Sequence, residues 1–186
     1  AEGVRITCEA TPHHLTLTDE AVGSYDADTK VNPPLRSEEH VAALREAVAS
    51  GLVDCIATDH APHHVESKDC EHGAAAFGMS GLETAIALIM DGLVNTGALQ
   101  HCTAITLLTT RPAKILEIDK GTLTPGSPAD ITIIDPDEVR TVDPRRFYSK
   151  GKNTPYKGMQ LRGWPWMTLV AGRIVFKEGS VMEMKL

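Results

Sequence analysis

The hydrophobic pattern of this 186-residue chain changes after about Leu116, and that change limits the folds it can adopt. Before it, short β-branched runs alternate with loops and with segments in which apolar residues recur at helical spacing. After it, short β-rich runs are separated by Gly, Pro and Asp. We therefore predict an α/β fold. Residues 1–115 would form the C-terminal strands and helices of a (β/α)8 TIM-type barrel, and residues 116–186 the C-terminal segment of a small β-sandwich domain.

Individual residues indicate the elements of the first part. Ser37 is a candidate N-cap, and Val41, Leu44 and Val48 then recur at helical spacing up to Gly51. The two prolines of KVNPPLR exclude a helix interior or a central strand, so we expect a rigid loop there. The other expected elements are strands at residues 4–10 and 52–59, a loop from residue 11 with a helical turn near residue 18, and helices within residues 81–97 and 100–118.

Charge and composition argue against some classes of partner. The chain has 25 acidic and 18 basic residues, a formal net charge of −7, and scattered basic residues, which argues against a nucleic-acid surface. The longest apolar stretch, residues 86–94, is interrupted by Asp91 and is too short to span a bilayer. Four cysteines without paired spacing indicate reduced thiols, and no secretory signal opens the chain, so we expect a cytoplasmic protein.

The stretch DCIATDHAPHH places Asp59 and three histidines directly after an apolar run. Because barrel enzymes carry catalytic groups at the C-terminal ends of their strands, Asp59 is a candidate catalytic residue. With His60 and His63 it could ligate a divalent metal such as Zn²⁺, act as a base or bind an anion. Pro62 would stiffen the loop and hold His63 at a fixed distance from Asp59. The alternatives are an Asp that only caps the next helix and a His-rich loop that is only solvated.

Three other places hold candidate site residues. His13 and His14 are adjacent, and adjacent residues of an extended chain point to opposite faces, so packing or supporting hydrogen bonds are expected rather than shared metal binding. Asn32 could offer its amide to a carbonyl or carboxylate, or it could form an Asx-turn. Phe77 and Gly78 approach a helix start, where their backbone amides could meet a ligand or where a hydrophobic staple could form.

Six motifs, in this order and spacing, resemble the C-terminal half of bacterial class I dihydroorotases, which belong to the amidohydrolase superfamily. They are TCEATPHHLTLTDE, KVNPPLRSEE, IATDHAPH, FGMSGLET, RPAKIL and GTLTPGSPADITIIDP. The last occurs in many amidohydrolases, whereas VNPPLR together with DHAPH is far more specific. Related hydantoinases and allantoinases usually carry Ser or Ala where Asn32 stands, and they lack the histidine at position 63.

The resemblance implies a dihydroorotase, which catalyses the reversible zinc-dependent cyclisation of N-carbamoyl-L-aspartate to L-dihydroorotate in de novo pyrimidine biosynthesis. By motif, Asp59 would be both a metal ligand and the general acid/base. The substrate would be held by Asn32 and His63, with backbone groups of Phe77 and Gly78 beside them. Supporting roles behind the site would fall to His60, His13 and His14, and His64 would have no specific role.

The resemblance also implies that part of the site lies outside this sequence. The family's His-x-His pair, bridging carboxylate, two further histidines and substrate-binding Arg have no counterpart here. The chain has no initiator Met and begins as if within a helix–loop–strand unit, so we expect a fragment. We expect it to be inactive alone, with one or two Zn²⁺ ions completed by ligands from a missing N-terminal half.

The expected partners are a small-molecule substrate, that N-terminal half, a second subunit in a homodimer, and an aspartate transcarbamoylase complex. Two other functions remain open. One is another cyclic amidase of the hydantoinase or allantoinase type. The other is a non-catalytic dihydroorotase-like partner of aspartate transcarbamoylase. The presence of Asn32, Asp59 and His63 favours a catalytic protein over the second of these.

Overall fold

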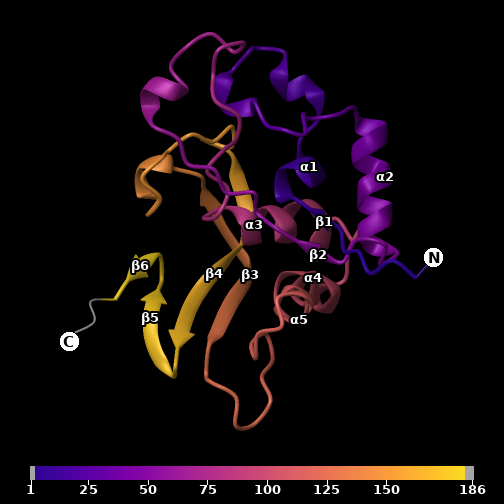
Figure 1. The fold of residues 1–186 in the computed structure, drawn as a ribbon. Coiled ribbons are helices and arrows are strands. Elements are labelled where there is room, and N and C mark those ends of the chain that lie inside the picture. Colours follow the sequence, from indigo (N-terminus) through magenta and orange to yellow (C-terminus); the bar gives the residue numbers. More distant parts are fainter. Residues whose placement is uncertain (1–2, 183–186) are drawn as a thin grey trace.

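The computed structural model describes residues 3–182 and shows a mixed α/β arrangement (Figure 1). Helices and loops of the first part lie above and beside an antiparallel sheet formed by the second part. The elements are, in chain order, β1 (Glu9–Ala10), α1 (Pro12–Thr16), η1 (Asp19–Val22), η2 (Ala27–Thr29), α2 (Glu38–Ala49), β2 (Cys55–Ile56), η3 (Val65–Ser67), α3 (Ala85–Ile89), η4 (Met90–Val94), α4 (His101–Leu108), α5 (Thr110–Ile115), β3 (Ile131–Thr141), η5 (Pro144–Arg146), β4 (Gln160–Val170), β5 (Arg173–Lys177) and β6 (Ser180–Val181).

A β-α-β unit leads to the candidate site. Strands β1 and β2 pair in parallel, and α2 connects them along the chain. The predicted helix is confirmed: α2 follows Ser37, has two acidic residues in its first turn, and ends before Gly51, which has a φ of 82°. Val41 and Val48 are its buried residues.

The first part differs from the prediction in three places. The strand expected over residues 52–59 is limited to Cys55–Ile56. The strand expected over residues 4–10 is limited to Glu9–Ala10, and the preceding described residues are exposed. The loop predicted from residue 11 is wrong at its start, because Pro12–Thr16 is a short helix. Thr11 accepts a hydrogen bond from the His14 N–H as an N-cap, and Pro12 suits the first helical position, so this turn has the signals of a helix start.

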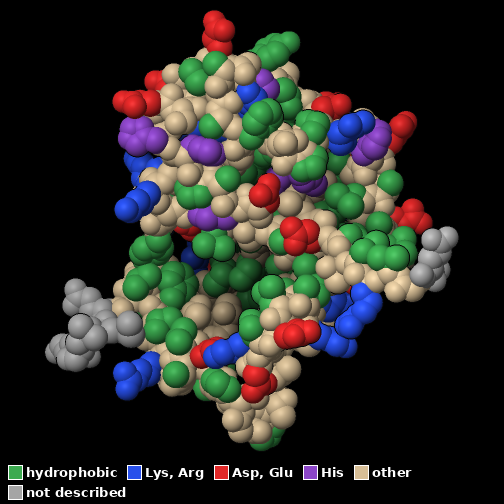
Figure 2. All heavy atoms as spheres, in the orientation of Figure 1, with side chains coloured by type: hydrophobic (Ala, Val, Ile, Leu, Met, Phe, Trp, Pro, Cys, Tyr) green, Lys and Arg blue, Asp and Glu red, His purple; other side chains and the backbone are tan. Residues whose placement is uncertain are grey.

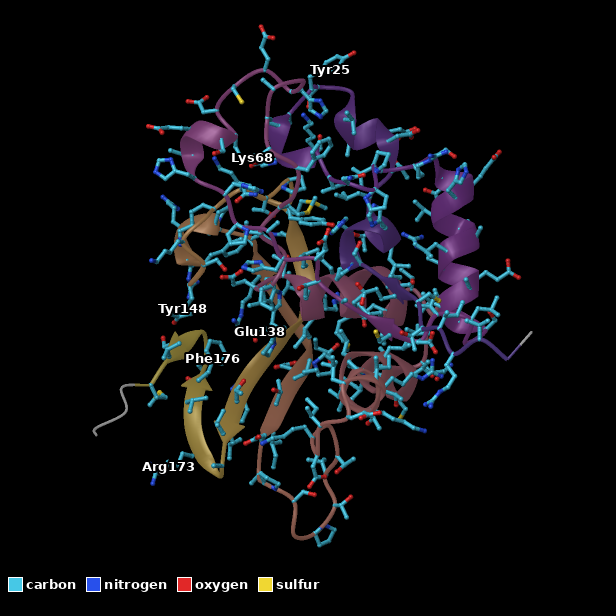
Figure 3. The ribbon with its side chains drawn as sticks, in the orientation of Figure 1. Tyr25, Lys68, Glu138, Tyr148, Arg173 and Phe176 are labelled. Atoms are coloured by element: carbon cyan, nitrogen blue, oxygen red, sulfur yellow. The ribbon has the colours of Figure 1, made fainter. Side chains whose placement is uncertain are left out.

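The second part forms a four-stranded antiparallel sheet in the order β3-β4-β5-β6, which confirms its predicted β character. Strands β3 and β4 are long, and their register shifts twice, once between Ile133 and Ile134 and once between Asp135 and Val139. Beside the sheet lies an apolar groove of about 700 Å³, which Figure 2 shows as a hollow lined with hydrophobic side chains. In Figure 3, Tyr148 and Phe176, which both line this groove, are labelled near each other.

The hydrophobic core continues from the first part into the second. One cluster combines Val31, Met79 and Leu88 with Tyr156 and Trp164. Helix α3 also packs against β4. The domain boundary proposed at 115/116 stays a prediction, as do the barrel and the sandwich. Residues 142–164 of the second part nevertheless pack closely on the first part, which carries the candidate site.

Two predictions from composition can be compared with the structure. All four cysteines are free thiols, and only Cys55 is buried. Among residues 3–182, no helix combines the length and the apolar character that a bilayer crossing requires.

Candidate active site

Asp59 lies three residues beyond the end of β2, and its backbone is in the left-handed region with a φ of 48°. Its side chain is exposed, and no side chain or backbone N–H of residues 3–182 donates a hydrogen bond to its carboxylate. The next helical turn, η3, is capped by His64 instead, whose Nδ1 accepts from the Glu66 N–H. The capping alternative for Asp59 is therefore wrong, and its carboxylate is free to bind a ligand.

His60 is held on both ring nitrogens. Its Nδ1 lies 3.1 Å from the N–H groups of Gly81 and of Leu82, so Nδ1 accepts and Nε2 carries the hydrogen. Nε2 then donates to the Ser149 hydroxyl oxygen at 3.1 Å, and that hydroxyl donates to Glu83 at 2.5 Å. This direction of donation excludes His60 as a base for Ser149. It also leaves neither ring nitrogen free for a metal, which fits a supporting role.

Glu83 completes this chain of hydrogen bonds. Burial raises the pKa of its carboxyl, but hydrogen bonds from the Ser149 hydroxyl and N–H outweigh burial and hold the pKa below its usual value. An ionised Glu83 accepts both Ser149 bonds and keeps the hydroxyl oriented toward it.

His63 connects two loops. Its Nε2 lies 2.8 Å from the Phe77 carbonyl oxygen, and its backbone N–H donates to the Asn153 Oδ1 at 2.9 Å. Its ring is half-buried, and Nδ1 has no hydrogen-bond partner within residues 3–182. The ring is therefore anchored at one nitrogen and open at the other.

Gly78 brings the loop of Asn32 to the loop of His63. Its N–H donates to the Lys30 carbonyl at 2.8 Å, and with a φ of 116° a Cβ on it would lie 2.5 Å from the Cβ of Ala61. Only glycine tolerates this backbone and this approach. Because the Gly78 N–H is already engaged, a direct substrate contact from it is not available, whereas the Phe77 N–H makes no hydrogen bond in the described chain.

Asn32 follows Lys30 by two residues and is exposed, and its peptide bond to Pro33 is cis. Its side chain makes no hydrogen bond to the described residues, so the Asx-turn alternative is not realised. The amide is thus free beside the loops of His63 and Phe77.

Two lysines hold the 64–78 loop against the segment before Asn32. Lys30 Nζ donates to the carbonyls of Gly73 and Ala75 and lies 4.5 Å from the Phe77 ring centre. The buried Lys68, labelled in Figure 3, donates to the carbonyls of residues 27 and 76. Burial lowers the pKa of Lys68, and the nearby Asp28 partly opposes this effect. A hollow of about 460 Å³, lined by residues including Tyr25, Lys30 and Phe77, lies beside this loop.

His13 and His14 lie on helix α1 rather than on an extended chain, with ring centres 4.4 Å apart. His14 contacts Thr11 through Nδ1 at 2.7 Å and, through Nε2 at 2.8 Å, the carbonyl of Pro33, the residue that follows Asn32. His13 is 2% exposed, and its Nε2 has no partner in the described residues. Burial, and to a lesser extent His14, lowers the pKa of His13 to about 3, so its ring is neutral.

The sequence matches the amidohydrolase family over residues 3–175. The chain belongs to the amidohydrolase family. It is 58% identical over 178 residues to a dihydroorotase from Pelotomaculum thermopropionicum and 52% identical over 176 residues to one from Syntrophus aciditrophicus. These matches cover 96% and 95% of this chain but 42% and 41% of the relatives, so the chain spans about two fifths of their length.

Solved structures of amidohydrolases agree with the fold. The L-hydantoinase (dihydropyrimidinase) from Arthrobacter aurescens superposes with a TM-score of 0.93 at 35% identity, over 98% of this chain and 42% of the other. A D-hydantoinase structure superposes with a TM-score of 0.86 at 28% identity, over 96% of this chain and 41% of the other.

The metal chemistry implied by the sequence fits one residue of this amidohydrolase chain. The Asp59 carboxylate is exposed and accepts no hydrogen bond from residues 3–182, and as an oxygen donor it suits Zn²⁺. No cluster of three or more His, Cys, Asp or Glu side chains in the span 3–182 could hold a metal by itself. Asp59 therefore fits as a single ligand, and a complete ligand set requires other residues.

Three site residues of this amidohydrolase were missed from the sequence. Ser149, Gly151 and Asn153 come from the second part, yet they contact the loop of His60 and His63. The only available signal was the polar run SKGKNT between Phe147-Tyr148 and Pro155-Tyr156, which has no periodicity and no metal-ligand spacing.

Proposed function

We propose that this chain provides part of the active site of a dihydroorotase, with Asp59 as the acid/base and with Asn32, His63 and the backbone of Phe77 around the substrate. The observation that best supports this is the joining of three loops. His63 bonds to Phe77, and Gly78 bonds to Lys30, two residues before Asn32. The high identity to proteins named dihydroorotase supports the choice of reaction.

The proposed chemistry centres on Asp59. In the hydrolytic direction, its carboxylate takes a proton from the attacking water while the water oxygen bonds to the carbonyl carbon of the ring amide. The same carboxyl group then gives that proton to the ring nitrogen as the C–N bond breaks, and ring closure is the reverse. A bound zinc ion, with Asp59 as one ligand, would polarise the amide carbonyl.

Substrate binding in this proposal uses groups that the fold leaves free. The Asn32 amide can donate to a carboxylate, and the neutral His63 ring can accept from an N–H at the substrate's ring edge through Nδ1, because its Nε2 is engaged. These groups suit a cyclic amide that carries a carboxylate. Gly78 contributes by allowing the close approach of its loop to Ala61 rather than by its N–H.

Finer features of the whole protein belong to the same proposal. They are a (β/α)8 barrel with a composite β-sandwich, one or two zinc ions completed by ligands from an N-terminal half, a homodimer, a cytoplasmic location, and an aspartate transcarbamoylase complex. The groove beside the sheet offers an apolar surface on which a further segment of the protein can pack. Residues 3–182 hold no complete metal cluster, so in this proposal the remaining ligands come from such a segment.

Another cyclic amidase remains the second candidate, because the solved structures with similar folds are hydantoinases. The natural full-length protein should be assayed with dihydroorotate, dihydrouracil, hydantoin and allantoin. We expect a kcat/KM for dihydroorotate at least 100-fold above the others, because only dihydroorotate carries the ring carboxylate that the Asn32 amide is proposed to hold. A higher kcat/KM for hydantoin or dihydrouracil than for dihydroorotate would indicate a hydantoinase instead of a dihydroorotase.

A second assay addresses the contribution of this chain alone. The 186-residue polypeptide should show no zinc-dependent turnover, because residues 3–182 hold no group of three or more possible ligands and Asp59 alone cannot retain a catalytic zinc ion. Turnover by this chain without any added segment would refute the proposed division of the site. No turnover of any cyclic amide by the natural full-length protein, with zinc bound, would favour the non-catalytic partner.

A further inference from the structure

We propose that Asn153 is a positioning residue for substrate binding, because it fixes the loop of His63 against the loop of Gly78. This inference rests on the proposed dihydroorotase function, and it adds to the site a residue from the second part of the chain. No motif used to assign the function includes Asn153.

The side chain of Asn153 connects both loops at once. Its Oδ1 accepts from the His63 N–H at 2.9 Å, and it shares the single hydrogen of the Ser80 hydroxyl, 3.1 Å away, with the Gly151 carbonyl. Its Nδ2 donates to the carbonyls of Ala61 and of Gly78, each at 3.2 Å. The N–H donor at His63 and the two carbonyl acceptors determine which amide atom is oxygen and which is nitrogen.

Burial makes these four bonds structurally important. Asn153 is 6% exposed, so water cannot replace a partner that is lost, and each unsatisfied group would cost free energy. No other side chain of similar size offers two donors and an acceptor in one plane. Aspartate would turn both donors into acceptors facing the carbonyls of Ala61 and Gly78, and glutamine would move the amide by one methylene group.

The residues around Asn153 hold the same loop. Gly151 lies so close to the His63 backbone that a Cβ on it would be 2.5 Å from the His63 nitrogen. The Gly151 carbonyl accepts from the Ser80 hydroxyl at 2.9 Å, and the Ser80 N–H donates to the Asn153 carbonyl at 2.7 Å. The segment 151–153 is therefore fixed from both its side chains and its backbone.

The contacts of Asn153 determine which kinetic constant should change. They reach His63, which is proposed to bind substrate, and Gly78, which follows Phe77 in the same loop. None of them involves the carboxylate of Asp59, which is proposed to transfer the proton. Loss of Asn153 should therefore weaken substrate binding more than it slows the chemical step.

The experiment compares Asn153→Ala and Asn153→Asp with Asn95→Ala in the natural full-length protein. Asn95 is exposed and its side chain makes no hydrogen bond in the described chain, so its variant is the matched control. We expect Asn153→Ala to raise the KM for dihydroorotate about 10- to 100-fold, with kcat within about threefold and unchanged bound zinc. Asn153→Asp places a carboxylate oxygen against the carbonyls of Ala61 and Gly78 in a buried site, so its KM should rise at least as much as that of Asn153→Ala.

Amide hydrogen exchange provides a readout that does not depend on activity. In Asn153→Ala, exchange should accelerate at least tenfold in peptides containing residues 61–63 and 78–80, and it should not change in Asn95→Ala. If the wild-type protein does not turn over dihydroorotate, the proposed function fails, while the exchange result still decides whether Asn153 fixes the loops.

Three outcomes would overturn the proposal. One is a KM within twofold of wild type in Asn153→Ala with normal exchange in both loops. Another is an equal loss of kcat and bound zinc, which would indicate general disruption. If Asn153→Ala does not fold, Asn153→Asp becomes the deciding variant, and a KM and exchange equal to those of the control would count against the proposal.

Discussion

The Nε2 atom of His63 lies 2.8 Å from the carbonyl oxygen of Phe77. A carbonyl oxygen can only accept, so Nε2 carries a hydrogen and, in the neutral ring, Nδ1 is an acceptor. The protein backbone thus fixes both the orientation and the tautomer of this ring. Nδ1 is the atom that remains for a ligand, as an acceptor when the ring is neutral and as a donor when it is protonated.

Substitution of His63 tests this assignment. His63→Ala should raise the KM for dihydroorotate about 10- to 100-fold, because it leaves one hydrogen-bonding group of the bound substrate without a partner. Steady-state kinetics of the natural full-length protein with zinc bound provides the measurement. His63→Gln can still donate to the Phe77 carbonyl but has no atom in the place of Nδ1, so we expect it to bind as weakly as His63→Ala. Normal binding by the Gln variant would show that Nδ1 does not contact the substrate.

Gly78→Ala should destabilise the natural full-length protein. A φ of 116° is unfavourable for alanine, and its Cβ would lie 2.5 Å from the Cβ of Ala61. We expect a loss of about 1–3 kcal/mol in the free energy of unfolding, measured by urea denaturation. Gly73→Ala, in the same loop with open space and no positive φ, is the control and should be neutral or slightly stabilising. Equal stabilities of the two variants would contradict this account.

Local signals in the sequence predicted the helices best. The Ser37 start, the spacing of Val41 and Val48, and the Gly51 stop are all short-range features, and α2 agrees with them. The strand at residues 4–10 was predicted from β-branched residues alone, but a strand requires a hydrogen-bonded neighbour. Within the described chain only Glu9 and Ala10 pair with β2.

The candidate site shows the same division between local and long-range information. A strand-end position and an adjacent proline indicated Asp59 and His63 from the sequence. Asn153 lies 90 residues from His63 along the chain, and no periodicity links the two. Their contact depends on how the segment after η5 packs on the first part, which is a property of the tertiary fold.

The pH dependence of stability should reflect His13. Because its pKa is lowered to about 3 in the folded protein and is about 6.5 in an unfolded chain, only the unfolded state binds a proton between these values. The stability that the neutral His13 ring gives to the folded state is therefore fully present above pH 6.5, and it is lost as the pH falls toward 3. From this residue we expect the free energy of unfolding to fall by about 0.7 kcal/mol between pH 7 and 6 and by about 1.2 kcal/mol between pH 6 and 5, measured by urea denaturation of the natural full-length protein.

Two variants isolate the His13 effect. His13→Leu removes the titrating ring and its partnerless Nε2, so its stability should depend less steeply on pH, by about one proton. His101→Gln removes an exposed histidine and should leave the wild-type slope unchanged. If the free energy of unfolding of His13→Leu depended on pH as steeply as that of wild type, the buried His13 ring would not be the cause of the pH dependence.

Asp59→Asn separates catalysis from folding. Asparagine keeps the size of the side chain and tolerates the left-handed backbone at φ 48°, so the fold should be retained. It cannot take a proton from water, and we expect kcat to fall by about 10²- to 10⁴-fold with an unchanged melting temperature. Asp69 is an exposed residue of the same loop, and Asp69→Asn should keep a normal kcat.

The Asp59→Ala variant loses both the carboxylate and the tolerance for this backbone. It should therefore reduce kcat similarly and also lower the free energy of unfolding by about 1–2 kcal/mol. A near-normal kcat in Asp59→Asn would remove Asp59 from the acid/base role.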